Sequence, residues 1–209
     1  MEEPHLTRGG RTQRDILDAA KVLFLTQGYT ATSMRQIARA VGITPSAIYN
    51  HFASKGEIFT SVLRAVAPFG LLSALFDGNH ADTPEALVDQ GLRGLMDTLI
   101  GHEDYLRLAL IDAQERDGAT LVGFMPQFFE RAMGFYQRLV ALDAAHGRLR
   151  PIPPFLFLQT LVSLILGYLI TERVVRPEQT FGLPHIDWVQ GLTDVFLHGV
   201  LNPPELERR

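Results

Sequence analysis

Side chains able to contact a polyanion lie close together near residue 50. Tyr49, His51 and Lys55 carry a phenol, an imidazole and an ammonium, which donate hydrogen bonds to phosphate oxygens. Ser46 and Asn50 carry a hydroxyl and an amide, which pair with base edges in the major groove of a duplex. Lys55 stands where a new helix is expected to begin, so backbone N–H groups lie beside its charge. Together these side chains favour contact with a nucleic acid.

Two short helices joined by a tight turn are expected to hold this surface. In residues 33–41 the apolar side chains recur at i, i+3, i+4 and i+7, the spacing of one buried helix face. They are Met34, Ile37, Ala38 and Val41. Gly42 allows the left-handed backbone that ends a helix, and Ile48 and Phe52 provide the inner face of the next one. This layout is typical of a helix-turn-helix.

Capping residues mark where these helices start. Ser33 and Gln36 form a capping box, in which each side chain satisfies a free backbone N–H at the helix start. Ser54 and Glu57 repeat that pattern before the following helix. The Thr-Pro pair at 44–45 suits an N-cap followed by the first helical position. Three helix starts are therefore predicted within 25 residues, from 33 to 57.

The segment from Arg11 to about Val66 resembles the DNA-binding domain of the tetracycline-repressor (TetR) family of transcription factors. The order and spacing of its motifs agree with the family over a little over a quarter of the chain. The motifs are ILDAA from Ile16, followed by Leu23 and Phe24, GY from Gly28, TSMRQIA from Thr32, VGIT from Val41, IYNHF from Ile48 and SKGEIF from Ser54. The rest of the chain resembles the family only in its all-helical layout.

The resemblance implies how this segment meets DNA. Residues 44–51, which begin with Thr44, would lie in the major groove, while neighbouring residues hold phosphates and fix the register. The residues expected nearest the bases are Ser46, Ala47 and Asn50. The residues expected to hold phosphates are Thr32 or Ser33, Tyr49, His51 and Lys55. Apart from the resemblance, an amino-terminal arm that contains Arg8, Arg11 and Arg14 is expected to add phosphate or minor-groove contacts, with a disordered tail as the alternative for Arg8. An ordinary three-helix hairpin packed for stability is the alternative.

The chain is expected to be all-α with two domains. A three-helix DNA-binding domain spans 11–67, with its helix-turn-helix at about 34–53, and a larger helical domain for ligand binding and dimerisation spans 68–209. No alternation of apolar and polar residues lasts long enough to predict a strand. Other helices are expected at 12–27, 54–67, 69–76, 84–100, 103–115, from about 125 or 127 to 145, and at 154–175 and 184–201.

The larger domain is expected to dimerise and to hold a ligand, as the resemblance implies. In the family the last two helices of each subunit form a four-helix interface, and two-fold dimers read half-sites about one turn, ~34 Å, or a multiple apart. The expected interface residues are Phe157, Leu164, Gly167, Val189, Leu192 and Phe196. The expected ligand-binding residues are Phe69, Met96, Leu99, Tyr105, Leu108, Phe124, Phe128, Tyr136, Leu161 and Tyr168. Such a lining suits a largely apolar effector.

Composition and charge set outer limits on function. The net charge is −4, but residues 1–66 hold eight Arg and Lys against five Asp and Glu, whereas residues 67–209 hold 11 against 18. A basic head on an acidic body fits a protein that presents one end to DNA. The longest uncharged run, residues 155–170, falls short of the ~20 residues that span a bilayer. With no signal peptide pattern either, the cytoplasm is the expected location.

No catalytic or metal-binding constellation is expected. Cysteine is absent, and Asp194 and His198, four residues apart, suit a solvated ion pair better than a metal site. Neither a glycine-rich phosphate loop nor a nucleophile elbow is present, so no enzyme activity and no cofactor are predicted. The expected function is a transcriptional repressor that binds a palindromic operator as a homodimer and leaves it when a small effector binds. An activator of the same fold, or a helical ligand-binding or interaction protein without DNA binding, is the alternative.

Overall fold

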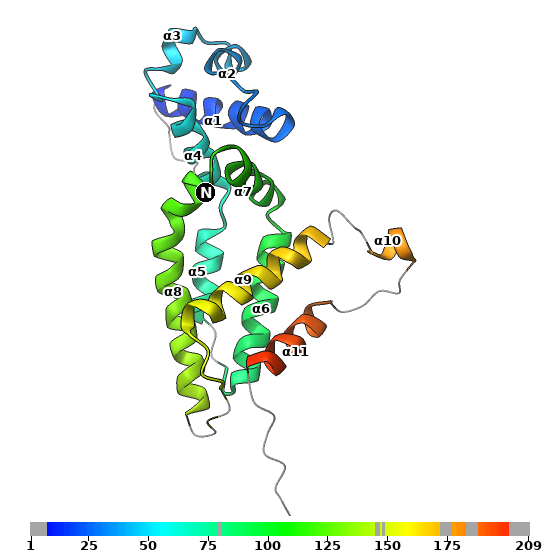
Figure 1. Ribbon diagram of the computed structural model, residues 1–209. Helices are drawn as coiled ribbons and strands as arrows, with labels where there is room; N and C mark the ends of the chain where they lie inside the picture. Colours follow the sequence, from blue (N-terminus) through cyan, green and yellow to red (C-terminus); the bar gives the residue numbers. More distant parts are fainter. Residues whose placement is uncertain are drawn as a thin grey trace, which may run out of the picture. The chain divides into compact units, whose positions relative to one another are not determined.

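The computed structural model describes residues 8–78, 81–144, 147, 149–171, 177–182 and 188–200. The regular elements in this part of the chain are helices, which confirms the all-α prediction (Figure 1). Contacts group the chain into two compact units, one of residues 1–68 and 102–125 and the other of residues 69–101 and 126–209. We call them unit 1 and unit 2.

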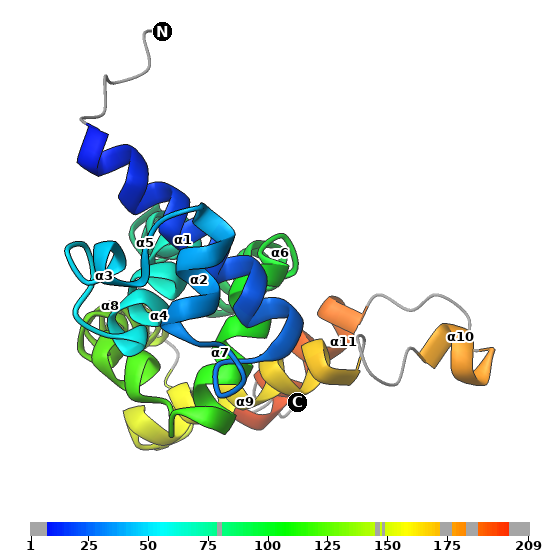
Figure 2. The ribbon, with the colours of Figure 1, turned by 90° about the horizontal axis from the view of Figure 1, so that it is seen from above.

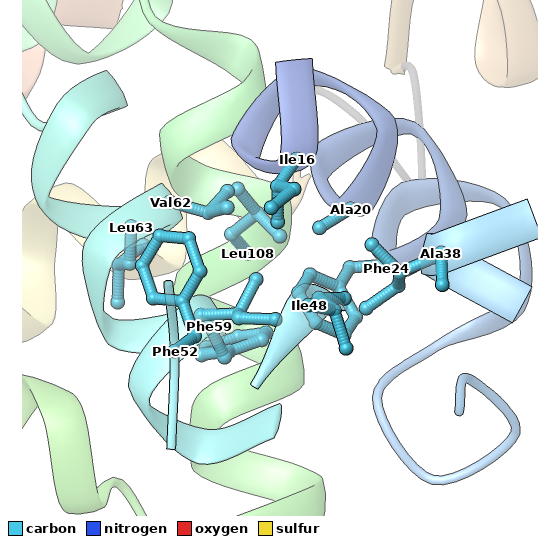
Figure 3. Close-up of a cluster of buried hydrophobic side chains, with 12 residues drawn as sticks. Ile16, Ala20, Phe24, Ala38, Ile48, Phe52, Phe59, Val62, Leu63 and Leu108 are labelled. Atoms are coloured by element: carbon cyan, nitrogen blue, oxygen red, sulfur yellow. The ribbon is translucent and has the colours of Figure 1, made fainter. Parts of the chain in front are cut away.

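Unit 1 is built around the predicted helix-turn-helix. Its helices are α1 (Arg8–Gln27), α2 (Met34–Val41), α3 (Pro45–Ile48), α4 (Lys55–Val66), α7 (Glu103–Glu115) and the first turns of α8 (Ala119–Asp143). Figure 3 shows the core they enclose, in which side chains from α1, α2, α3 and α4 meet one from α7, Leu108. Leu108 is fully buried, so α7 contributes to the same core as the three helices of the predicted DNA-binding domain.

Local capping starts the helices of unit 1 as the sequence predicts. The Ser33–Gln36 capping box is present in both directions, and Gly42 ends α2 in the left-handed region at φ 78°. The Thr44 hydroxyl accepts a hydrogen bond from the backbone N–H of Ala47 at 3.2 Å. The Ser54 hydroxyl accepts from the N–H of Glu57 at 3.1 Å, while the Glu57 carboxylate reaches back to the N–H of Ala53 at 2.7 Å.

Unit 2 contains the remaining helices, and its core draws on most of them. They are α5 (Phe69–Gly78), α6 (Pro84–Ile100), the rest of α8, α9 (Pro154–Ile170), α10 (Pro177–Phe181) and α11 (Trp188–Val200). Helix α6 packs against α5, α9 and α11. Glycine allows a close approach between α5 and α6, since a Cβ at Gly94 would overlap the side chain of Leu75.

Helices α1, α3 and α8 differ most in extent from the sequence prediction, while the predicted end of the helix at 154–175 and the predicted start of the helix at 184–201 lie outside the described residues. Helix α1 begins at Arg8 instead of residue 12, and the regular part of α3 ends at Ile48, although bonds from His51 N to Ile48 O and from Asn50 N to Ala47 O continue its path as turns. Helix α8 begins at Ala119 and runs through Pro126, whereas the predicted start is about residue 125 or 127. The capping group of α8 explains this: it is a carboxylate from the preceding helix, Asp112, which no local pattern indicates.

No single helix among the described residues is both long enough and apolar enough to cross a membrane. The sequences of α4 and α5 reach that length and composition only when they are taken together.

Candidate nucleic-acid interface

Helix α3 and the turn after it place one apolar side chain inward and polar ones outward. Ile48 is fully buried, whereas Tyr49 is 57 % exposed and Ser46 and Asn50 are also exposed. Figure 2 shows α3 at the rim of unit 1, beside α2 and α4. Ala47 is half-buried. The side chains expected nearest the bases, and the expected phosphate contact Tyr49, therefore lie along the same short segment.

Thr32 and Ser33, the two candidates for a phosphate contact at the start of α2, differ in their exposure. Thr32 is only 2 % exposed, and its hydroxyl donates to the carbonyl oxygen of Gly28 at 2.7 Å and accepts from Gln27 at 3.1 Å. This corrects the expectation for the Thr32 side chain, which closes the turn between α1 and α2 instead of facing solvent. Ser33 is exposed and bonds the Gln36 side chain at 2.8 Å, so it is the member of the pair that a phosphate can reach.

Lys55 opens α4, and its ammonium group lies against the segment of residues 28–32, which we call the α1–α2 turn. Its Nζ donates to the carbonyl oxygens of Tyr29 and Thr32, both at 2.7 Å, and lies 4.1 Å from the centre of the Tyr29 ring. Burial lowers the pKa of Lys55, the charge of Glu115 opposes that change, and Arg116 adds to it. Two of the three ammonium donors are used by these carbonyls, so a phosphate contact relies on the third.

His51 and Arg11 are the remaining residues predicted to bind DNA. His51 is half-buried, in the turn that follows α3. Arg11 and Arg14 are exposed on the first turns of α1, which Figure 2 shows extending past α2. The amino-terminal arm of the prediction is therefore helical from Arg8 onward.

Sequence reasoning missed two charged residues, at the end of α7 and in the loop after it, that contact the α1–α2 turn, and a third that pairs with one of them. Glu115 accepts a hydrogen bond from the backbone N–H of Thr30 at 2.6 Å. Arg116 lies 4.9 Å from the centre of the Tyr29 ring and pairs with the buried carboxylate of Asp112 at 2.9 Å. The partners are 85 residues apart in the case of Glu115 and Thr30, and no periodic or capping signal in the sequence links them.

The predicted ligand-binding residues are divided between the two units. Tyr105, Leu108 and Phe124 belong to unit 1, where Leu108 is part of the core and the two rings pack against it. The side chain of Leu108 has no exposed surface. The other seven belong to unit 2, and among them Met96, Leu99 and Leu161 are buried; the full set there is Phe69, Met96, Leu99, Phe128, Tyr136, Leu161 and Tyr168.

Two of the predicted dimer-interface residues lie inside the protomer. Phe157 is 1 % exposed and Phe196 is 4 % exposed, and their rings meet edge to face with centroids 5.1 Å apart. They are corrected to core residues that join α9 to α11, because an aromatic side chain on the inner face of an apolar helix packs within its own unit first. Leu164 and Leu192 are half-buried and Gly167 is exposed, while the side chain of Val189 lies outside the described residues.

The part of the chain that carries this surface matches a known family. The sequence profile described as "Bacterial regulatory proteins, tetR family" matches residues 16–62, which run from α1 to α4. The chain is 29 % identical over 140 residues to the HTH-type transcriptional regulator TcmR of Streptomyces glaucescens, covering 65 % of this chain and 60 % of TcmR. It is 41 % identical over 139 residues to the HTH-type transcriptional repressor KstR2 of Rhodococcus jostii, covering 66 % of this chain and 46 % of KstR2.

A solved structure extends the similarity to nearly the whole chain. The crystal structure of NalD, the secondary repressor of the MexAB-OprM multidrug efflux pump in Pseudomonas aeruginosa, matches with a TM-score of 0.66 and 28 % identity over 92 % of this chain and 98 % of NalD. Of TcmR and KstR2, by contrast, the chain covers less than two thirds of the length. Residues 16–62 therefore resemble the DNA-binding part of the tetR family of bacterial regulatory proteins, and the chain has an amino-terminal helix-turn-helix and a helical carboxyl-terminal part, as NalD does.

Proposed function

We propose that this chain is a transcriptional regulator that binds a palindromic operator as a homodimer and represses transcription until a largely apolar effector releases it. The observation that carries the proposal is the outward face of α3 and its following turn. Its one inward side chain, Ile48, is fully buried, while Ser46, Tyr49 and Asn50 face solvent and have no packing role within the unit. Polar side chains on the second helix of a helix-turn-helix are placed to read base edges in the major groove.

Phosphate contacts on both sides of α3 would fix its register. Ser33 at the start of α2 and Lys55 at the start of α4 flank the segment, and each lies at a helix start, where backbone N–H groups attract anions. Arg11 and Arg14 on the exposed first turns of α1 add positive charge to the same unit. Contacts of this kind supply affinity without sequence preference, whereas Asn50 and Ser46 would supply the preference.

Apolar side chains left exposed on unit 2 support the proposed dimer. On α9, Leu156, Leu166 and Ile170 are 53 %, 45 % and 48 % exposed, and on α11 Val195 is 65 % exposed. Small residues accompany them: a Cβ added at Gly167 on α9 or at Gly191 on α11 would have no atom within 4 Å. A second copy of the chain covering these faces would bury them and place two helix-turn-helix units on one duplex.

We propose a largely apolar effector because the buried side chains of unit 2 are themselves mostly apolar. Met96 and Leu161 represent that interior, which offers few polar partners to a ligand. Mass spectrometry of compounds that copurify with the native protein would identify the effector class. Recovery of only highly charged metabolites, with DNA release on adding them, would contradict this part of the proposal.

Fluorescence anisotropy with duplex DNA from upstream of the chain's own gene tests the proposal as a whole. We expect saturable binding at low ionic strength that weakens steeply with salt, and Asn50→Ala should reduce the preference for one base pair by about 1–3 kcal/mol. A shuffled duplex of the same length is the control. Absence of binding to any duplex would reject DNA binding in favour of an interaction protein. A run-off transcription assay on the bound fragment would distinguish a repressor from an activator.

A further inference from the structure

The α1–α2 turn is held by a carboxylate from a distant helix. Gly28 ends α1 at φ 83°, and within the turn the N–H of Thr32 donates to the carbonyl oxygen of Tyr29 at 3.1 Å. The N–H of Thr30 points the other way and donates to Glu115 Oε2 at 2.6 Å. Packing is equally close, since a Cβ at Gly28 would stand 2.6 Å from Glu115 Oε1. The carboxylate therefore fits closely against the backbone of the turn, in a space that glycine leaves open.

Two cations complete the support of this turn through the ring of Tyr29. The Lys55 ammonium lies 4.1 Å from the ring centre and bonds the carbonyl oxygens of Tyr29 and Thr32. The Arg116 guanidinium lies 4.9 Å from the same ring centre and 4.7 Å from that of Phe59. Cations near an aromatic ring are attracted to its negative face. The turn that leads into α2 is thus held by α4 and by α7 with the loop that follows it.

Arg116 is itself fixed by a buried carboxylate. Asp112 is fully buried; its Oδ1 accepts from Arg116 at 2.9 Å, and its Oδ2 accepts from the N–H groups of Thr120 and Leu121 at 2.9 and 3.0 Å. A buried charge is stable only when it is paired and hydrogen-bonded, and Asp112 meets both conditions. The end of α7, the start of α8 and the α1–α2 turn therefore form one connected network.

We propose that Glu115 is a positioning residue for DNA binding, because its carboxylate fixes the α1–α2 turn. The fixed turn holds two groups in place: the carbonyl oxygens that bind Lys55, and the start of α2 at Ser33. The inference rests on the proposed function, because it assigns Lys55 and Ser33 to phosphates. Hydrogen bonds from Thr30 lower the pKa of Glu115, so the carboxylate is charged near neutral pH. Glu115 is exposed, so its loss leaves the core of unit 1 in place.

Two substitutions separate the hydrogen bond from the charge. Glu115→Ala removes both, whereas Glu115→Gln removes the charge but keeps a carbonyl oxygen that can accept from Thr30. Charge alone predicts tighter DNA binding for both variants, because each loses one negative group near a polyanion. Positioning predicts that Glu115→Ala binds about tenfold more weakly, and that Glu115→Gln binds at least as well as the original chain.

The test combines anisotropy on the upstream duplex with hydrogen exchange at the Thr30 amide. We expect Thr30 to lose protection in Glu115→Ala and to keep it in Glu115→Gln; Glu130→Gln on α8, which changes the net charge equally at an exposed position, should leave both measurements unchanged. Equal duplex affinities for the original chain and Glu115→Ala, or equal Thr30 protection in them, would overturn the positioning role alone. Failure of the original chain to bind any duplex, with Thr30 still protected through Glu115, would overturn the proposed function instead.

Discussion

The two units of this protein differ in the kind of surface that they leave uncovered. Unit 1 packs most of its large apolar side chains into one core, with Val22, Leu110, Val122 and Met125 left exposed, and it exposes polar and basic side chains around α3 and the start of α1. Unit 2 has a core of its own but leaves apolar side chains exposed on α9 and α11, with Phe155 and Val195 at 66 % and 65 % exposure. Polar exposed surface suits a charged partner, whereas contiguous apolar surface indicates another protein surface.

The difference between the two exposed surfaces is consistent with a division of roles, in which unit 1 would bind DNA and unit 2 would bind a second copy of the chain. In unit 1 the polar groups of the α1–α2 turn are satisfied by Glu115, Lys55 and Thr32, so the residues that face outward are free to serve a ligand. In unit 2 the aromatic pair Phe157 and Phe196 belongs to the core, and other apolar side chains of the same two helices are exposed. The following changes test this contrast, from the largest expected effect to the smallest.

The core of unit 1 should be highly sensitive to truncation. Phe59 is fully buried, and its ring lies 5.0 Å from that of Phe24 and 5.4 Å from that of Tyr29. We expect Phe59→Ala to lower the free energy of unfolding by about 3–5 kcal/mol through lost burial and a cavity. Urea unfolding measures this, with Val22→Ala, at a position 57 % exposed, as a control expected within about 0.5 kcal/mol. Equal losses of unfolding free energy in Phe59→Ala and Val22→Ala would contradict the burial of Phe59 in the core of unit 1.

A bulky side chain on the exposed face of α9 should weaken the proposed dimer. Gly167→Arg meets no atom of its own chain within 4 Å of the new Cβ, so the protomer should stay folded. A packed interface should lose about 1–3 kcal/mol from the overpacking, which raises the dimer dissociation constant about tenfold or more. Sedimentation velocity measures the change. Gly70→Arg on α5, also in open space, is the matched control, and equal dimerisation of both variants would move the interface away from α9.

Two of the three described left-handed glycines of unit 1 should differ in how much stability an alanine substitution costs. Gly28 and Gly42 have φ of 83° and 78°, so alanine is strained at both, by about 1–2 kcal/mol. Only Gly28 has a neighbour, Glu115 Oε1 at 2.6 Å from the added Cβ, whereas Gly42 has open space. We expect Gly28→Ala to be the more destabilising by thermal unfolding, and the excess to disappear in a Glu115→Ala background. If Gly28→Ala remains more destabilising than Gly42→Ala in the Glu115→Ala background, the clash with the Glu115 carboxylate is not the reason for the difference.

The smallest expected effect is the pH dependence of the Glu115 contact. Because hydrogen bonds from Thr30 hold its pKa below the ordinary value of 4.5, the contact contributes stability above pH 4.5 and loses it as the pH falls through the lowered value. The difference in melting temperature between the original chain and Glu115→Gln should therefore shrink as the solution is acidified below pH 4.5. A difference that grows on acidification would contradict the assigned direction.

Short-range features of this protein are determined by its sequence, because the interacting groups are only a few residues apart. The capping pair Ser33 and Gln36, the Thr44 cap and the Gly42 turn require no knowledge of the rest of the fold, and all are present. The apolar face of α2 and the inward Ile48 follow from helical periodicity in the same way. The family resemblance also rests on these local motifs, and the match to residues 16–62 confirms it.

Only the tertiary structure decided which chemically similar side chains serve which role. Thr32 and Ser33 are neighbours with the same hydroxyl group, yet one closes a buried turn and the other faces solvent. Periodicity marks Phe157 and Phe196 as apolar without saying whether they face their own unit or a second copy. Glu115 meets Thr30, 85 residues away, only when α7 packs against α1 and α4, because hydrogen bonds between distant segments depend on how helices dock and leave no periodic trace in the sequence.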